Sequence, residues 1–138
     1  MPYNSRMLGV THLDHVSVIV TDVARSRAFY RDVLGLMEIA PPREFDFVAL
    51  WFALGNGQTL HLLQKPTADT LSPRHFCLHV GDAASAREHF HRHGVPTEET
   101  TTIAAADRFF VRDPDGNRIE LLQWLRPYEP VADGRFSA

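Results

Sequence analysis

Hydrophobic and polar positions alternate along several short stretches of the chain, and two segments between these stretches have the pattern of a helix. Residues 12–20 alternate and are rich in valine and isoleucine, which predicts a half-buried strand. Residues 23–34 follow Asp22 and end at Gly35, so they predict a helix with a polar N-cap and a glycine stop. Residues 45–54 and 59–64 predict two further strands, joined by a turn at residues 55–58.

The same order of elements returns in the second half of the chain. Residues 74–80 predict a strand, Asp82 a helix cap, residues 83–93 a helix and Gly94 its end. Residues 107–124 predict a strand, a turn over the sequence DPDG and another strand. The unit predicted for each half is therefore βαβββ, in which one strand per copy has the weakest pattern.

An internal repeat connects the two halves. Residues 14–30 match residues 74–90 without a gap, so that His15 lies over His75 at an offset of 60. Residues 57–64 match residues 116–123 at an offset of 59, which places His61 over Glu120. We predict one α+β domain over residues 1–138, with two βαβββ modules in tandem forming a curved trough of mixed sheet. The modules span about 11–64 and 74–125, the linker 65–73, and an irregular tail 126–138.

Composition narrows the classes of function. The 138 residues are 44% hydrophobic and 22% charged, which is typical of a globular domain, and the net charge of −3 argues against a nucleic-acid or anionic-membrane partner. No apolar stretch is long enough to cross a bilayer, and the first ten residues lack the pattern of a signal peptide. Because Cys77 is the only cysteine, no internal disulfide is possible, which favours a reducing compartment, the cytoplasm.

Four polar side chains fall on the strand faces that should carry no helix. They are His15, His61, His75 and Glu120, and each opposes a run of aliphatic neighbours. If the strands curve into one trough, these side chains converge on its floor. Three imidazoles and one carboxylate suit a divalent ion such as Zn²⁺, Ni²⁺, Mn²⁺, Co²⁺ or Fe²⁺. The alternatives are a histidine pair in the core with a surface glutamate, and a His61 that hydrogen-bonds substrate instead of metal.

Four segments resemble the vicinal oxygen chelate superfamily, which includes glyoxalase I, fosfomycin-resistance proteins, extradiol dioxygenases and bleomycin-resistance proteins. They are LDHVSVIVTD, SRAFYRDVLGL, RHFCLHV and DPDGNRIELLQ, and the resemblance covers roughly residues 11–125. It implies a metal held by His15, His75 and Glu120, with His61 at the place of a further ligand in glyoxalase I. It also implies a homodimer with two sites, each built within one chain or across two subunits.

The expected function is that of a divalent-metal-dependent, glyoxalase-like lyase or isomerase with a small-molecule substrate. Four protein ligands on a six-coordinate ion leave two positions, which a substrate with adjacent oxygens occupies while the metal stabilises an enolate-like oxyanion. The resemblance implies that Glu120 is the catalytic base. Ala40 stands near the place where glyoxalase I usually has an arginine that contacts glutathione, so the use of glutathione is left open.

Two other functions remain open from the sequence. An extradiol-type ring-cleaving dioxygenase needs two histidines, one carboxylate and three open metal positions, and His61 as a fourth ligand argues against it. A metal-free small-molecule binding or resistance protein, of the bleomycin-resistance type, has no need of the four potential ligands.

Overall fold

The computed structural model describes residues 7–137 of the chain. Residues 1–6, which belong to the stretch without a signal-peptide pattern, and residue 138 lie outside the described part. The elements in chain order are β1 (His15–Val20), α1 (Val23–Arg27), the π-helix η1 (Ala28–Val33), β2 (Met37–Ile39), β3 (Ala49–Ala53), β4 (Thr59–Gln64), β5 (His75–His79), α2 (Ala83–Arg92), β6 (Ala106–Arg112), β7 (Arg118–Trp124) and α3 (Pro130–Asp133). None of the helices in residues 7–137 has the length and apolar character that a membrane span requires.

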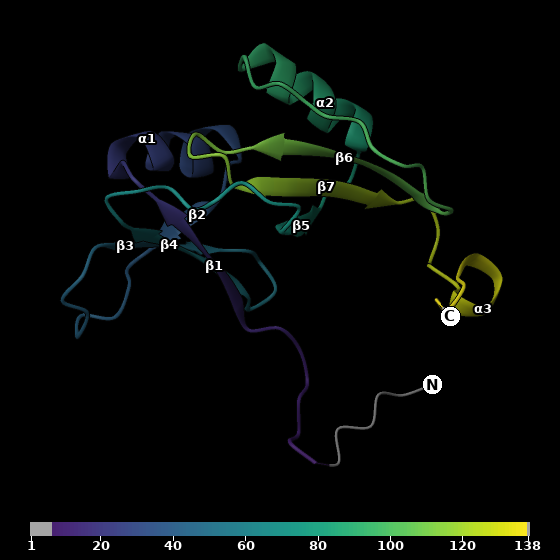
Figure 1. Ribbon diagram of the computed structural model, residues 1–138, viewed down its shortest axis with the longest axis horizontal. Helices are drawn as coiled ribbons and strands as arrows, with labels where there is room; N and C mark the ends of the chain where they lie inside the picture. Colours follow the sequence, from purple (N-terminus) through teal and green to yellow (C-terminus); the bar gives the residue numbers. More distant parts are fainter. Residues whose placement is uncertain (1–6, 138) are drawn as a thin grey trace.

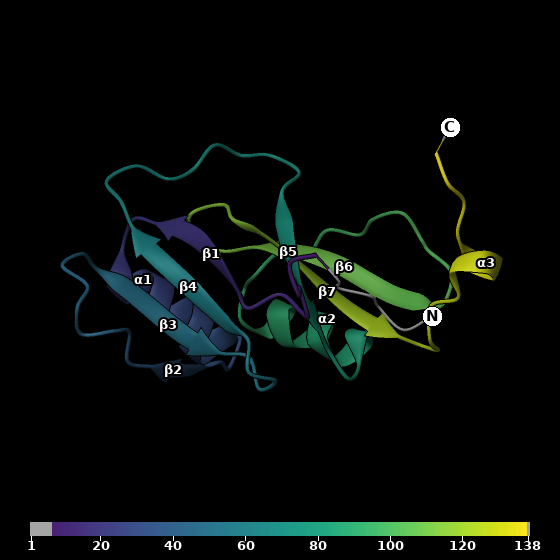
Figure 2. The ribbon, with the colours of Figure 1, turned by 90° about the horizontal axis from the view of Figure 1, so that it is seen from below.

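The strands form two sheets, one in each half of the chain (Figure 1). The first has the order β1-β4-β3-β2, and the second has the order β5-β7-β6. In each sheet the strand that precedes the helix pairs in parallel with the last strand, and the remaining pairs are antiparallel. Seen from below, the sheets lie side by side in front of their helices (Figure 2). The predicted α+β fold with two mixed sheets is confirmed.

The two modules differ in their weakest strand. In the first module this strand is the three-residue β2, whereas in the described part of the second module its counterpart is a single bridge between Glu98 and Phe110. The strand predicted over residues 45–54 is too long, because β3 covers only Ala49–Ala53. The amide of Phe45 donates to the Pro42 carbonyl at 3.3 Å, so this segment turns before it reaches the sheet.

The helix signals of the sequence are confirmed at both ends. The carboxylates of Asp22 and Asp82 each accept the backbone N–H three residues further on, at 2.9 and 3.0 Å. Gly35 and Gly94 follow the helices with φ of 74° and 69°, a left-handed conformation that glycine adopts without strain.

The first helix is not regular along its length. The prediction of one α-helix over residues 23–34 is wrong in its second half, which is the π-helix η1. There the amide of Leu34 donates to the carbonyl of Phe29, five residues back, at 2.9 Å. The wider turn accompanies the burial of two consecutive side chains, Phe29 and Tyr30, against the sheet.

The hydrophobic core lies between the sheets and their helices. Leu60 and Leu62 of β4 are fully buried on this side, as are Ile119 and nearly all of Leu121 of β7. Other members include Val20, Phe52, Phe90, Phe109 and Val111. The apolar positions of both strands therefore face the helices, as their alternation predicts, and the intervening positions face away.

The turn between β6 and β7 also joins the two modules. The Tyr30 hydroxyl donates to the buried carboxylate of Asp113 at 2.7 Å, and the Asn117 amide donates to the Ile19 carbonyl at 2.8 Å. The Thr21 hydroxyl donates to Asp115 at 2.6 Å. Burial, and then the negative charge of Asp113, raise the pKa of Tyr30 well above its usual value, so the hydroxyl stays a donor. The DPDGN segment is thus a polar clamp between the modules as well as a hairpin turn.

Replacing Tyr30 with phenylalanine is expected to lower the free energy of unfolding by about 1.5–3 kcal/mol, since it leaves a buried carboxylate short of a donor. Urea denaturation measures the change. The matched control is Tyr128→Phe, at a half-exposed tail position, for which we expect a change below about 0.5 kcal/mol. Equal effects of the two substitutions would show that the clamp contributes little.

Candidate functional site

The first pair of predicted site residues lies on the helix-free face of the first sheet. His15 begins β1, and His61 lies in β4 opposite Ser17, so the two histidines are diagonal neighbours. Their rings stack with centroids 4.2 Å apart and an interplanar angle of 22°. Trp51 of β3 covers the other face of His61 at 3.7 Å and 10°. His61 is therefore held between two rings, with only the edge of its imidazole available to a ligand.

The surroundings of this pair orient the ring of His15 and favour the neutral form of His61. Nδ1 of His15 lies 2.8 Å from Asp14 Oδ2, an arrangement that leaves Nε2 available. Nε2 of His61 lies 2.7 Å from the hydroxyl of Thr59. Burial, and then the neighbouring His15, lower the pKa of His61, which therefore stays uncharged at neutral pH, the form that binds metals.

The second pair lies on the helix-free face of the second sheet. His75 begins β5, and its Nε2 is 3.0 Å from Oε1 of Glu120 in β7. Glu120 is only 6% exposed, and Arg108 donates to its other oxygen at 3.3 Å. Nδ1 of His75 lies 2.9 Å from the Pro73 carbonyl, which can only accept, so Nδ1 carries a proton. Nε2 then faces Glu120 Oε1, and this contact needs a proton or a metal cation between the two atoms.

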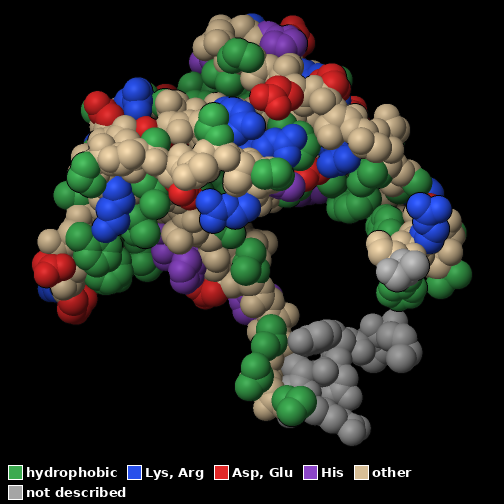
Figure 3. Space-filling model, in the orientation of Figure 1, with side chains coloured by type: hydrophobic (Ala, Val, Ile, Leu, Met, Phe, Trp, Pro, Cys, Tyr) green, Lys and Arg blue, Asp and Glu red, His purple; other side chains and the backbone are tan. Residues whose placement is uncertain are grey.

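The two pairs are equivalent by strand register. Ser17 lies opposite His61, and Cys77 opposite Glu120, so each pair spans the same diagonal of its sheet. Among residues 7–137, however, no three His, Cys, Asp or Glu side chains come close enough to hold one ion. Within one chain the four residues therefore form two separate pairs, which we treat as two half-sites of a metal site. We call His15 with His61 the N half-site, and His75 with Glu120 the C half-site. Histidine side chains are visible on the lower surface, away from the helices (Figure 3).

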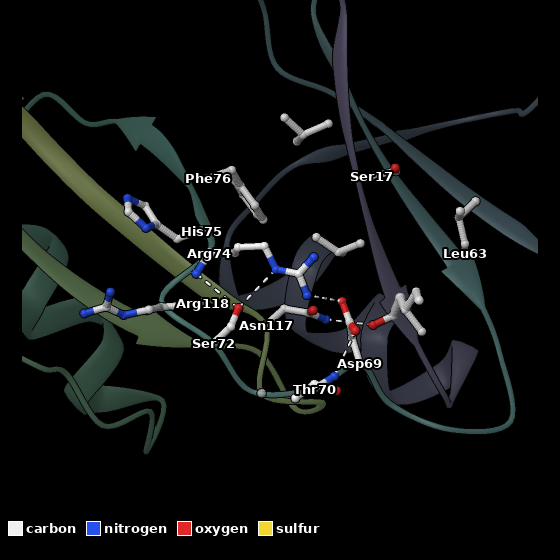
Figure 4. Close-up of a pocket in the computed structure, with 14 residues that line it drawn as sticks. Ser17, Leu63, Asp69, Thr70, Ser72, Arg74, His75, Phe76, Asn117 and Arg118 are labelled. Atoms are coloured by element: carbon white, nitrogen blue, oxygen red, sulfur yellow. Dashed lines mark hydrogen bonds and ion pairs between the residues drawn. The ribbon is translucent and has the colours of Figure 1, made fainter.

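A pocket of about 490 Å³ lies elsewhere, at the junction of the modules between the edge strands β1 and β5 (Figure 4). Both polar and apolar side chains line it, and an ion pair of 3.2 Å between Arg74 and Asp69 lies among them. Of the four predicted site residues only His75 reaches this pocket. The N half-site therefore lies on the open sheet face away from the junction pocket, whereas the C half-site borders the pocket through His75.

Sequence reasoning did not assign a role to Arg108 or Arg118, which share the helix-free face with Glu120. The sequence does indicate that Arg118 lies beside Glu120, because residues two apart on a strand share a face and Arg118 precedes Glu120 by two. Cys77 also lies on this face and is exposed. The surrounding protein, and then the charge of Glu120, raise the pKa of its thiol to about 11, so no thiolate forms at neutral pH.

Comparison with known proteins gives a consistent result. The family profile of the Glyoxalase/Bleomycin resistance protein/Dioxygenase superfamily matches residues 12–121. Glyoxylase I 4 of Arabidopsis thaliana is 28% identical over 125 residues, which cover 83% of this chain and 71% of that protein.

Two solved structures share both fold and sequence similarity. A protein assigned to the glyoxalase family from Bacillus anthracis superposes with a TM-score of 0.77 at 25% identity, covering 83% of this chain and 96% of that one. TnmS3, an antibiotic binding protein from Streptomyces sp. CB03234, superposes with a TM-score of 0.72 at 25% identity, covering 85% and 98%. The resemblance found in the sequence is confirmed: this chain belongs to the glyoxalase/bleomycin resistance protein/dioxygenase superfamily.

Proposed function

We propose that this protein is a divalent-metal-dependent, glyoxalase-like lyase or isomerase, and that its small substrate is chelated through adjacent oxygens. One observation carries the proposal. On the helix-free face of the first sheet His15 contacts His61, and at the repeat-equivalent positions of the second sheet His75 contacts Glu120. In each pair a histidine Nδ1 is engaged by an oxygen of the protein, the Asp14 carboxylate or the Pro73 carbonyl. Outer partners of this kind orient metal-binding histidines.

The donor atoms of the half-sites fit a divalent ion. Two donor atoms bound to one ion at about 2.0–2.1 Å lie no more than about 4 Å apart. The rings of His15 and His61 are in contact, with centroids 4.2 Å apart, which brings two imidazoles to the same place on the first sheet. His75 Nε2 and Glu120 Oε1, at 3.0 Å, are within the same limit. Three imidazole nitrogens and a carboxylate suit Zn²⁺, Ni²⁺, Mn²⁺, Co²⁺ or Fe²⁺.

A homodimer supplies the means to join the half-sites. We propose that each of two sites combines the N half-site of one subunit with the C half-site of the other. The surface of the described residues is partly apolar. Large apolar side chains contribute to this surface, including Met37, Phe45, Phe47, Trp124, Leu125 and Tyr128. Exposed apolar groups of this kind are expected on a subunit taken without its partner.

The chemistry divides between the ion and the chain. A bound divalent ion would supply Lewis-acid polarisation of two substrate oxygens. Glu120, the one carboxylate of the four residues, accepts the proton from the carbon next to the carbonyl after it loosens from the ion, because ligation lowers the basicity of a carboxylate. Arg108 donates to Glu120 and fixes the orientation of this base. Trp51 covers His61 and keeps water from one face of its ring.

A metal-free binding protein is the second candidate, and the aromatic side chains on and beside the first sheet favour it. Phe45 and Phe47 stack at 4.6 Å, and Phe45 meets Trp51 edge-on at 6.1 Å, which forms a wall suited to a flat apolar ligand. The similarity to the antibiotic binding protein TnmS3 agrees with this function. The paired ligand residues favour the metal enzyme instead.

A deuterium-exchange experiment tests the proposed reaction. Hydroxyacetone has a hydroxyl next to a ketone, and general-base catalysis of proton abstraction should speed exchange of its adjacent C–H in D₂O about 100-fold. NMR follows the exchange with protein loaded in turn with each of the five ions, and the metal-free protein is the control. Absence of enhanced exchange with every ion would contradict the lyase or isomerase. Iron-dependent oxygen uptake with catechol would indicate the dioxygenase, and failure to take up any ion would favour the binding protein.

A further inference from the structure

Arg118 lies beside the C half-site on the helix-free face of the second sheet. It pairs with His75 in strand register, and its guanidinium carbon lies 3.5 Å from the ring centroid of Phe110. The ring of His75 meets the same phenylalanine edge-on, at 5.0 Å and 90°. In Figure 4 the side chains of His75 and Arg118 extend in the same direction, away from the ion pair in the junction pocket. Phe110 therefore holds both side chains next to each other.

The charge of Arg118 has no counterpart in the described part of the chain. Its Nε–H is buried without an acceptor, and none of the ion pairs among residues 7–137 includes it. The neighbouring arginines differ, since Arg108 pairs with Glu120 and Arg112 with Glu98. A buried donor without a partner is unfavourable and needs a structural explanation, and an acceptor supplied by a bound ligand is one such explanation. Of the three side-chain atoms left in this state among the described residues, the others being Ser26 Oγ and Trp51 Nε1, only that of Arg118 carries a positive charge.

We propose that Arg118 is an anion-binding subsite, which receives a carboxylate or phosphate group of the substrate beside the metal position. The stack on Phe110 fixes the plane of the guanidinium, and its N–H edge offers the planar pair of donors that matches two oxygens of such a group. The nearby carboxylate of Glu120 contacts His75 and Arg108 and, among residues 7–137, forms no ion pair with Arg118. The inference implies that the substrate is a small anion with two adjacent oxygens besides its charged group. This part of it rests on the proposed function.

Anion titration of the full-length, metal-free protein tests the subsite. Acetate and inorganic phosphate are the probes, and the arginine Nε–Hε resonances report binding by NMR. We expect saturable shifts with at least one probe, and at least a tenfold loss of affinity in Arg118→Gln. Arg118→Lys keeps the charge but loses the planar fork, so an intermediate loss is expected. Arg92→Gln, on an exposed α2 position paired with Glu88, is the matched control and should bind as the wild type does. The stronger probe identifies the carboxylate or the phosphate.

Two results would overturn the subsite: no saturable binding of either anion to the wild-type protein, or equal affinities in the wild type and Arg118→Gln. Thermal denaturation checks that each variant is folded, and Arg118→Lys provides the comparison if Arg118→Gln is not. Mn²⁺ titration separates this inference from the proposed metal site, since Arg118→Gln should retain Mn²⁺ affinity within threefold. The two proposals can fail separately. If the wild-type protein takes up no metal but binds anions, and Arg118→Gln loses this binding, the anion subsite is supported and the metal enzyme is rejected.

Discussion

Replacing Glu120 with glutamine is expected to lower the affinity of the protein for Mn²⁺ at least 100-fold and to remove its exchange activity. Loss of an outer partner of a ligand already reduces metal affinity about 10–100-fold, and loss of the ligand itself should exceed this. Glu120 is also the proposed base, so proton abstraction has no acceptor in the variant. Isothermal titration calorimetry measures the affinity, and the hydroxyacetone assay measures the exchange.

The matched control for this prediction is Glu99→Gln. Glu99 pairs with Arg87 at 3.0 Å, outside both half-sites, and its side chain is largely exposed. Its replacement should leave Mn²⁺ affinity and exchange unchanged. Circular dichroism of Glu120→Gln distinguishes loss of metal from loss of fold, because Arg108 loses its charged partner in this variant. Retention of Mn²⁺ affinity within threefold in the folded variant would exclude Glu120 as a ligand.

Mixing two inactive variants should restore sites if each site is shared between subunits. One variant carries His15→Ala and His61→Ala, and the other carries His75→Ala and Glu120→Gln. A mixed dimer then has one site with no ligands and one site with all four. With random pairing of equal amounts, half of the dimers are mixed, so about a quarter of the wild-type metal sites should return, by the symmetry of a twofold dimer.

This mixture also separates the two possible arrangements of the site. If all four residues of one chain bind one ion, no combination of the variants restores a complete site. The variants are refolded together from urea, and exchange activity and bound Mn²⁺ are compared with the unmixed variants. Recovery near a quarter supports the shared site, and the absence of recovery in a sample that contains mixed dimers contradicts it.

Local sequence patterns predicted much of the fold because strand alternation, helix caps and glycine stops depend on interactions between residues close in sequence. The alternation in residues 59–64 matches strand β4, and the aspartate caps and glycine stops bound the first helix and α2 where expected. The repeat correctly identified equivalent residues on the two sheets, since a duplicated register keeps matched side chains on matched faces.

Features that depend on packing were not predictable in the same way. The predicted strand over residues 45–54 follows directly on a turn at Pro42–Phe45, and β3 begins only at Ala49. The sequence also does not distinguish η1 from a regular helix. The separation of the N and C half-sites is set by contacts between modules, such as those of Asp113, and strand periodicity contains no information about them. The role of Arg118 depends on which arginines find carboxylate partners, which only the structure reveals.

The most direct test of the shared metal site is anomalous diffraction from crystals of the protein grown with Mn²⁺ or Zn²⁺, recorded at the absorption edge of the metal. We expect one ion per site, about 2.0–2.2 Å from nitrogens of His15 and His61 of one subunit and from His75 and Glu120 of the partner subunit. An ion bound elsewhere, or half-sites of the two subunits that do not meet in the dimer, would contradict the account.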